Sequence, residues 1–184
     1  MKKPIKTTLY FEAGFPVLGK VLSSSMCPHC EDEGEIRVRT ARDPSEPTKY
    51  DVNDPSTFVD IVGFDPKGAY LKVKPGDWIE AQIVCFGYLR RVRASQISIE
   101  GNLLASGSSK VGRVSVDGQR LTVDFLVFKA MLVAQSEEEM QRIIKREKIR
   151  DGIFLETDCS VDIEVRRVRH QASSVSRGIS RSLS

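Results

Sequence analysis

The stretch VGRVSVDGQRLTVDFLVF, residues 111–128, decides the fold class of this chain. Apolar and β-branched residues alternate with polar ones on both sides of Asp117-Gly118. An Asp-Gly pair between two alternating segments is the strongest short-range signal for a two-residue β-hairpin. The sequence therefore predicts a hairpin with strands over 111–116 and 119–128.

Extended segments continue on both sides of this hairpin. Alternation and β-forming residues predict them over 5–11, 15–22, 35–40, 57–63, 69–74, 78–93, 95–104, 153–155 and 159–165. We expect Ala13-Gly14 to turn between the first two, which makes them a hairpin. Residues 78–93 are the longest extended run, and both its odd and its even positions are largely apolar up to Tyr88, which predicts a central strand that is covered on both faces.

One helix is predicted, over residues 136–149 (SEEEMQRIIKREKI). Ser136 and Glu139 form a capping box, acidic residues fill the first turn and basic residues the last, and Gly152 lies just beyond. Met140, Ile143 and Ile144 form one narrow apolar stripe, so the helix should lie on a sheet. The fold class is therefore mainly β: a β-sandwich or open β-barrel of about 8–10 short strands with one capping helix.

The composition predicts one folded domain with a short extension. A chain of 184 residues with 40% hydrophobic residues is long enough for a single core. We expect a β-rich domain over 1–164, interrupted by a loop-rich excursion at 23–56 that contains serines, prolines and one edge-type strand. Residues 165–184 form a basic, Ser/Arg-rich C-terminal extension.

The positive charge of the chain is concentrated in that extension. The net charge is +3, from 28 basic and 25 acidic residues, and the extension holds five of the basic residues and none of the acidic ones. Such a segment is typical of binding to nucleic acid or to an anionic membrane surface. An inert tail and an arm that orders on a second subunit are the alternatives. The candidate anion-binding residues are Arg166, Arg167, Arg169, Arg177 and Arg181.

A second cationic segment is CFGYLRRVR, residues 85–93. Its aromatic side chains, Phe86 and Tyr88, are candidates for stacking on bases, and its cations are Arg90, Arg91 and Arg93. Aromatic rings interleaved with guanidinium groups are typical of single-stranded nucleic-acid sites. In the alternative interpretation, which we favour on sequence alone, Phe86 and Tyr88 belong to the core and the arginines form the solvated end of a strand.

The string Cys27-Pro28-His29-Cys30 resembles the redox pair of the thioredoxin superfamily. That chemistry needs the first cysteine at a helix N-terminus, whereas an acidic run follows here and no βαβ pattern surrounds it. Cys27 and Cys30 at the tip of a hairpin over Val21–Val38 are also candidate zinc ligands. Cys159 and His170 are the candidates to complete that site. The alternative, which we favour on sequence alone, is a metal-free loop with two exposed thiols. We expect no other cofactor and no structural disulfide.

Several function classes have no support in the sequence. No phosphate-binding glycine motif occurs, and the two histidines stand in a loop and in the tail, so we expect no enzyme activity and no small-molecule substrate. No segment reaches the roughly 18–20 apolar residues of a membrane span. The N-terminal sequence does not look like a secretory signal, so we expect a cytoplasmic or particle-associated protein.

These observations favour a non-enzymatic structural protein that assembles into homo-oligomers. Its basic C-terminus would contact nucleic acid or an anionic membrane, in the manner of a viral coat, matrix or other virion component. The main alternative is an OB-type module that binds single-stranded nucleic acid. A zinc-ribbon protein is the weaker alternative.

Overall fold

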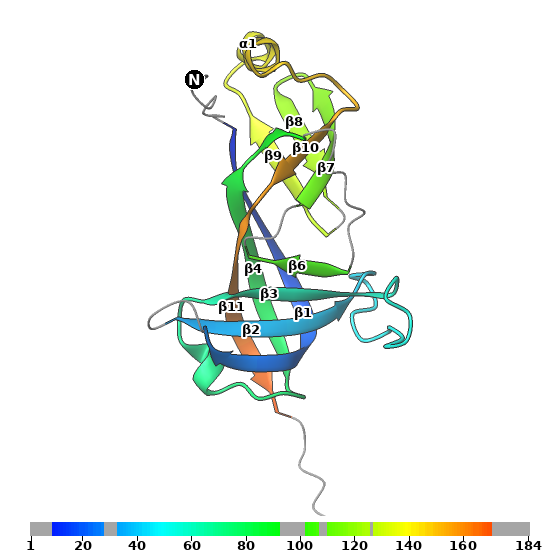
Figure 1. Ribbon diagram of the computed structural model, residues 1–184, viewed down its shortest axis with the longest axis vertical. Coiled ribbons are helices and arrows are strands. Elements are labelled where there is room, and N and C mark those ends of the chain that lie inside the picture. The colour runs from blue at the N-terminus through cyan, green and yellow to red at the C-terminus, as the bar shows by residue number, and fades with distance from the viewer. Residues whose placement is uncertain (1–8, 28–32, 93–101, 107–109, 126, 171–184) are drawn as a thin grey trace, which may run out of the picture.

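The computed structural model describes residues 9–27, 33–92, 102–106, 110–125 and 127–170. Within these ranges the chain forms eleven strands, one short 3-10 helix and one α-helix. The strands form a sheet of six and a sheet of five (Figure 1). The fold is therefore mainly β and barrel-like with a single α-helix, which confirms the predicted fold class.

The six-stranded sheet closes into a barrel. Its order is β11 (Ser160–Arg169), β4 (Trp78–Tyr88), β1 (Tyr10–Met26), β2 (Gly34–Ala41), β3 (Phe58–Asp65) and β6 (Leu103–Ala105). β11 also pairs with β3 in parallel, with Asp162 opposite Phe64, so β1, β2, β3, β11 and β4 form a ring. The other pairs in the ring are antiparallel. We call this ring the barrel.

Strand β1 holds the barrel together because it pairs with two neighbours in succession. Residues 10–20 pair with β4, and residues 20–26 pair with β2, with a shift of register between Val21 and Ser23. A side chain at Gly19 would lie 2.8 Å from the Arg39 carbonyl oxygen, so glycine is needed where β1 meets β2. The predicted turn at Ala13-Gly14 is wrong: both residues stand inside the continuous strand, opposite Cys85 and Val84.

The five-stranded sheet lies between β4 and β11 in the sequence. Its order is β5 (Arg90–Arg91), β10 (Phe154–Thr157), β7 (Lys110–Asp117), β8 (Arg120–Asp124) and β9 (Lys129–Val133). The predicted hairpin is confirmed as β7 and β8, with Gly118 at a φ of 56°. β8 ends at Asp124, earlier than predicted, and beyond it the Phe125 amide donates to the Phe128 carbonyl at 2.9 Å. Figure 1 shows this sheet and the helix above the barrel.

Helix α1 (Glu137–Glu147) has the predicted N-terminus. The Glu139 amide donates to Ser136 Oγ at 3.1 Å, and the Gln135 amide donates to the Glu139 carboxylate at 2.7 Å. The helix ends earlier than predicted, at Lys148, which adopts the left-handed conformation with a φ of 53°. Met140 is buried. The apolar stripe therefore faces the core, as expected.

Other local expectations need correction. Strand β2 carries residues 35–40 and lies between β1 and β3, so it is not an edge strand. Of the described residues of the excursion 23–56, those outside strands are Cys27, Glu33 and 42–56. Residues 69–74 are not a strand, because Ala69–Leu71 form a 3-10 turn (η1) after Gly68, whose φ is 72°. The predicted segment 95–104 falls mostly outside the described residues, as does the start of segment 5–11.

The core runs through the barrel and continues under the second sheet. Alternate residues of β4, namely Ile79, Ala81, Ile83 and Cys85, are almost completely buried. The opposite face of β4 is partly open, so coverage on both faces was a wrong prediction. Within the described ranges, no helix combines the length and apolar character that a membrane span requires.

Candidate nucleic-acid interface

An open groove of about 400 Å³ lies where β1 and β4 reach the second sheet. The rings of Tyr10 and Tyr88 meet edge to face, with centroids 5.3 Å apart and an angle of 65° between the planes. Tyr10 is 45% exposed and Tyr88 is 58% exposed. We call this feature the aromatic groove; its lining is Tyr10, Phe86, Gly87, Tyr88, Arg90, Asp158 and Ser160.

The register of β4 decides that these rings face outward. Side chains alternate between the two faces of a strand. Because Ile83 and Cys85 are buried on one face of β4, Phe86 and Tyr88 lie on the other face, which is open to solvent. Tyr88 pairs with Tyr10, and Phe86 stands between Glu12 and Ser160 of the neighbouring strands. The interpretation of Phe86 and Tyr88 as core residues is therefore wrong, and the structure gathers them into one open site.

Arg90 forms one wall of the groove and is held by two carboxylates. Its Nε donates to Glu156 Oε1 at 2.8 Å, and its Nη2 donates to Asp158 Oδ2 at 2.7 Å. The hydrogen bond to the buried Glu156, together with the one to Asp158, outweighs the effect of burial and raises the pKa of Arg90. Arg90 thus offers a fixed planar surface for stacking rather than an unpaired charge. Arg91 beside it is exposed, and Arg93 lies outside the described residues.

A second charged surface, which the sequence analysis missed, lies on β2 and β3. Arg37 and Arg39 both reach Asp60, with nitrogen to oxygen distances of 2.6 Å. Burial alone would raise the pKa of Asp60, but hydrogen bonds from Arg39 and Arg37 outweigh burial and lower it. Arg39 also lies 4.0 Å from the centre of the Phe58 ring. The alternation of arginines in EIRVRT was the available signal.

The basic C-terminal residues divide into two groups. Arg166, Arg167 and Arg169 belong to β11, which continues five residues beyond Glu164. Their side chains lie near carboxylates: Arg169 and Arg167 reach Glu80 at 2.9 and 3.9 Å, and Arg166 reaches Glu164 at 3.4 Å. They are thus part of the folded strand rather than of an extension. Arg177 and Arg181 lie outside the described residues.

The structure separates the candidate zinc ligands. β1 and β2 form the predicted hairpin, and the Cys27 amide closes its tip by donating to the Glu33 carbonyl at 2.8 Å. Cys159 and His170 stand at opposite ends of β11, which spans about 30 Å, so they cannot share one ion. No group of metal-binding side chains occurs among the residues that the structure describes. Cys30 lies outside the described residues.

The cysteines also lack the setting of a redox pair. Cys27 is buried at the end of β1, and β2 begins at Gly34, which leaves six residues between them. Among the described residues, β1 leads into the antiparallel strand β2, which differs from the strand followed by a helix that the thioredoxin redox pair requires. Cys85 and Cys159 are buried beside each other, and the hydrogen bond with Cys159, together with burial, raises the pKa of Cys85.

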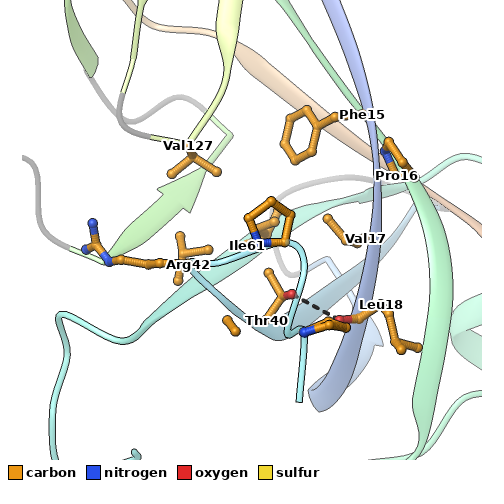
Figure 2. Close-up of a pocket in the computed structure, with 12 residues that line it drawn as sticks. Phe15, Pro16, Val17, Leu18, Thr40, Arg42, Ile61 and Val127 are labelled. Atoms are coloured by element: carbon orange, nitrogen blue, oxygen red, sulfur yellow. Dashed lines mark hydrogen bonds between the residues drawn. The ribbon is translucent and has the colours of Figure 1, made fainter. Parts of the chain in front are cut away.

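An apolar pocket of about 170 Å³ opens where β1 diverges from β2 (Figure 2). Phe15, Val17 and Ile61 form part of its wall, and Val127 reaches it from the second sheet. Its polar side chains are engaged by the backbone: Thr40 Oγ1 donates to the Leu18 carbonyl at 2.9 Å, and Arg42 Nε donates to the Phe58 carbonyl at 3.1 Å. The pocket therefore offers apolar contact but no reactive group.

Comparison with protein family models, with curated proteins and with solved structures found no match to this chain. Its function has to be inferred from the geometry of these surfaces.

Proposed function

We propose that this protein is an OB-type module that binds single-stranded nucleic acid without catalysis. A five-stranded, partly open barrel is the architecture of oligonucleotide-binding folds, and β1, β2, β3, β11 and β4 form such a ring. The observation that carries the proposal is the outward arrangement of Tyr10, Phe86 and Tyr88 beside Arg90. This proposal corresponds to the OB-type module that the sequence offered as the main alternative to a self-assembling structural protein.

The groove suits bases better than it suits phosphates. Exposed rings stack on any base, and each stacked base contributes about 1–3 kcal/mol. Arg90 is held in place by Glu156 and Asp158, which balance its charge. The plane of its guanidinium group can therefore stack on a base without acting as an unpaired cation. The exposed Arg91, next along the chain, is placed to meet the phosphate backbone. Binding of this kind has little sequence preference and weakens with salt.

Fluorescence anisotropy with a labelled oligothymidylate of about 12 nucleotides tests the proposal, because OB folds cover about 4–16 nucleotides. The wild-type chain should bind the single strand more tightly than a duplex of the same length. Tyr88→Ala should weaken binding about fivefold or more, since the loss of one stacked base removes at least about 1 kcal/mol. Phe86→Ala should act in the same direction.

Phe154→Ala is the matched control. Phe154 is a 49% exposed aromatic residue on β10 and does not line the groove, so its removal should leave the affinity unchanged. Circular dichroism would establish that each variant is folded. Equal affinities for Tyr88→Ala, Phe154→Ala and the wild type would refute the assignment of the groove.

A second candidate function is the self-assembly expected from the sequence. Met131 and Val133 are 47% and 65% exposed on β9, the last strand of the second sheet, and exposed apolar side chains on a sheet favour association. Light scattering over a range of concentrations should show larger species for the wild type than for Val133→Lys. The viral coat or matrix character of such an assembly stays a prediction.

A further inference from the structure

A cavity of about 220 Å³ lies between the C-terminal end of α1 and strand β5, and Arg90 lines both this cavity and the aromatic groove. Its floor is made of four buried aliphatic side chains: Leu9, Leu89, Ile149 and Leu155. The remaining lining residues are charged: Arg90, Arg91, Arg146, Glu147 and Lys148. The cavity is therefore apolar at its base and mainly cationic at its rim.

Two of the rim cations are available to a ligand. Arg90 is engaged by Glu156 and Asp158, and Arg146 by Glu147. Within the part of the chain that the structure describes, neither Arg91 nor Lys148 forms an ion pair. Lys148 is held at the rim by the left-handed turn that ends α1.

The floor excludes a nucleobase as the natural occupant. A base carries hydrogen-bond donors and acceptors around its edge, and four aliphatic side chains would leave them without partners. A ligand with a hydrocarbon body and an anionic end satisfies both parts of the cavity.

We propose that this cavity binds a small amphiphilic anion, such as a medium-chain carboxylate. The hydrocarbon body would contact Leu89, Ile149 and Leu155, and the anionic end would lie between Arg91 and Lys148. Such a site differs from the aromatic groove in ligand chemistry and needs no nucleic acid, although it shares Arg91 with the proposed phosphate contact. It would give the module a second, small-molecule ligand.

The experiment uses anilinonaphthalene sulfonate, a fluorescent amphiphilic anion, with the full chain, and octanoate as competitor. One equivalent of dye should bind, and octanoate should displace it, with affinity rising about fourfold per added methylene along a series from butanoate to octanoate. In the double variant Arg91→Gln/Lys148→Gln the affinity for octanoate should fall about tenfold or more. Arg120→Gln/Lys129→Gln, which removes two cations of the second sheet that do not line the cavity, should bind as the wild type does.

The thermal midpoint of each variant would establish that the fold is retained. Failure of octanoate to displace the dye would overturn the proposal, and so would equal octanoate affinities in the two double variants. Anionic lipid vesicles provide a separate arm. If Arg91 and Lys148 were needed for binding to vesicles but free octanoate did not bind, the surface would be a membrane contact and the small-ligand proposal would be wrong.

Discussion

Removal of the charge of Asp60 tests how the barrel tolerates a buried carboxylate on its β2–β3 face. Asp60 is 2% exposed and accepts hydrogen bonds from Arg37 and Arg39 at 2.6 to 2.9 Å. The loss of one member of a buried ion pair costs about 3–5 kcal/mol when its partner remains buried. The side chains of Arg37 and Arg39 are 43% and 20% exposed, so water compensates them in part. We therefore expect Asp60→Asn to cost about 2–3 kcal/mol.

The assay is unfolding in urea at several pH values, with the fluorescence of Trp78 as the signal. Because the pKa of folded Asp60 is lowered, its contribution is complete above the unfolded pKa of about 3.9 and is lost as the pH falls through the folded pKa. The difference between wild type and Asp60→Asn should thus be full at pH 7 and shrink below about pH 4.

Asp124→Asn is the control for this prediction. Asp124 is an exposed carboxylate whose Oδ2 lies 3.9 Å from Lys129 Nζ, and an exposed pair of this kind contributes about 0–1 kcal/mol. If Asp60→Asn and Asp124→Asn had the same urea midpoint at pH 7, the reasoning about the Asp60 cluster would be refuted. A loss that did not diminish in acid would show that it arises from altered packing.

Two further predictions concern the backbone. Gly34→Ala should destabilise the fold by about 1–3 kcal/mol in the same urea assay, because the new methyl carbon would lie 1.9 Å from the Tyr70 ring. Gly14→Ala is the control and should have little effect, because its methyl carbon would lie 3.0 Å from the end of the flexible Gln82 side chain. Equal urea midpoints for the two variants would contradict the close contact between residue 34 and Tyr70. Ser136→Ala should cost about 1 kcal/mol through the lost helix cap, measured as a lower thermal midpoint, and Ser136→Asp should recover most of it.

The sequence was sufficient where a local signal decides the structure. Asp117-Gly118 and the Ser136 cap each determine their own element, and the hairpin with Val21 opposite Val38 followed from the same kind of reasoning. The strand prediction for 69–74 failed because a side-chain contact decides the conformation there: the Tyr70 amide donates to Oδ2 of Asp65, five residues earlier, at 2.6 Å, and the chain forms a 3-10 turn.

The candidate site depended on a choice that the sequence indicates only weakly. Apolar residues occur on both faces of residues 78–88, and only Glu80 and Gln82 favour an outward position for the face that carries Phe86 and Tyr88. Pairing with β1 and β11 makes that choice, and it also brings Tyr10 beside Tyr88 from the start of the chain. The continuity of β1 was missed for a related reason, since Ala13-Gly14 looks like a turn until a partner strand is present.

The position of β11 in the ring affects how the protein folds while it is being synthesised. β11 joins β3 to β4, yet every strand of the five-stranded sheet emerges from the ribosome before residues 160–169 do. While the five-stranded sheet is being translated, β3 and β4 therefore lack their partner β11, and the barrel stays open between them. An open seam exposes strand edges to other chains, so expression at lower temperature or with chaperones should improve the yield of soluble protein.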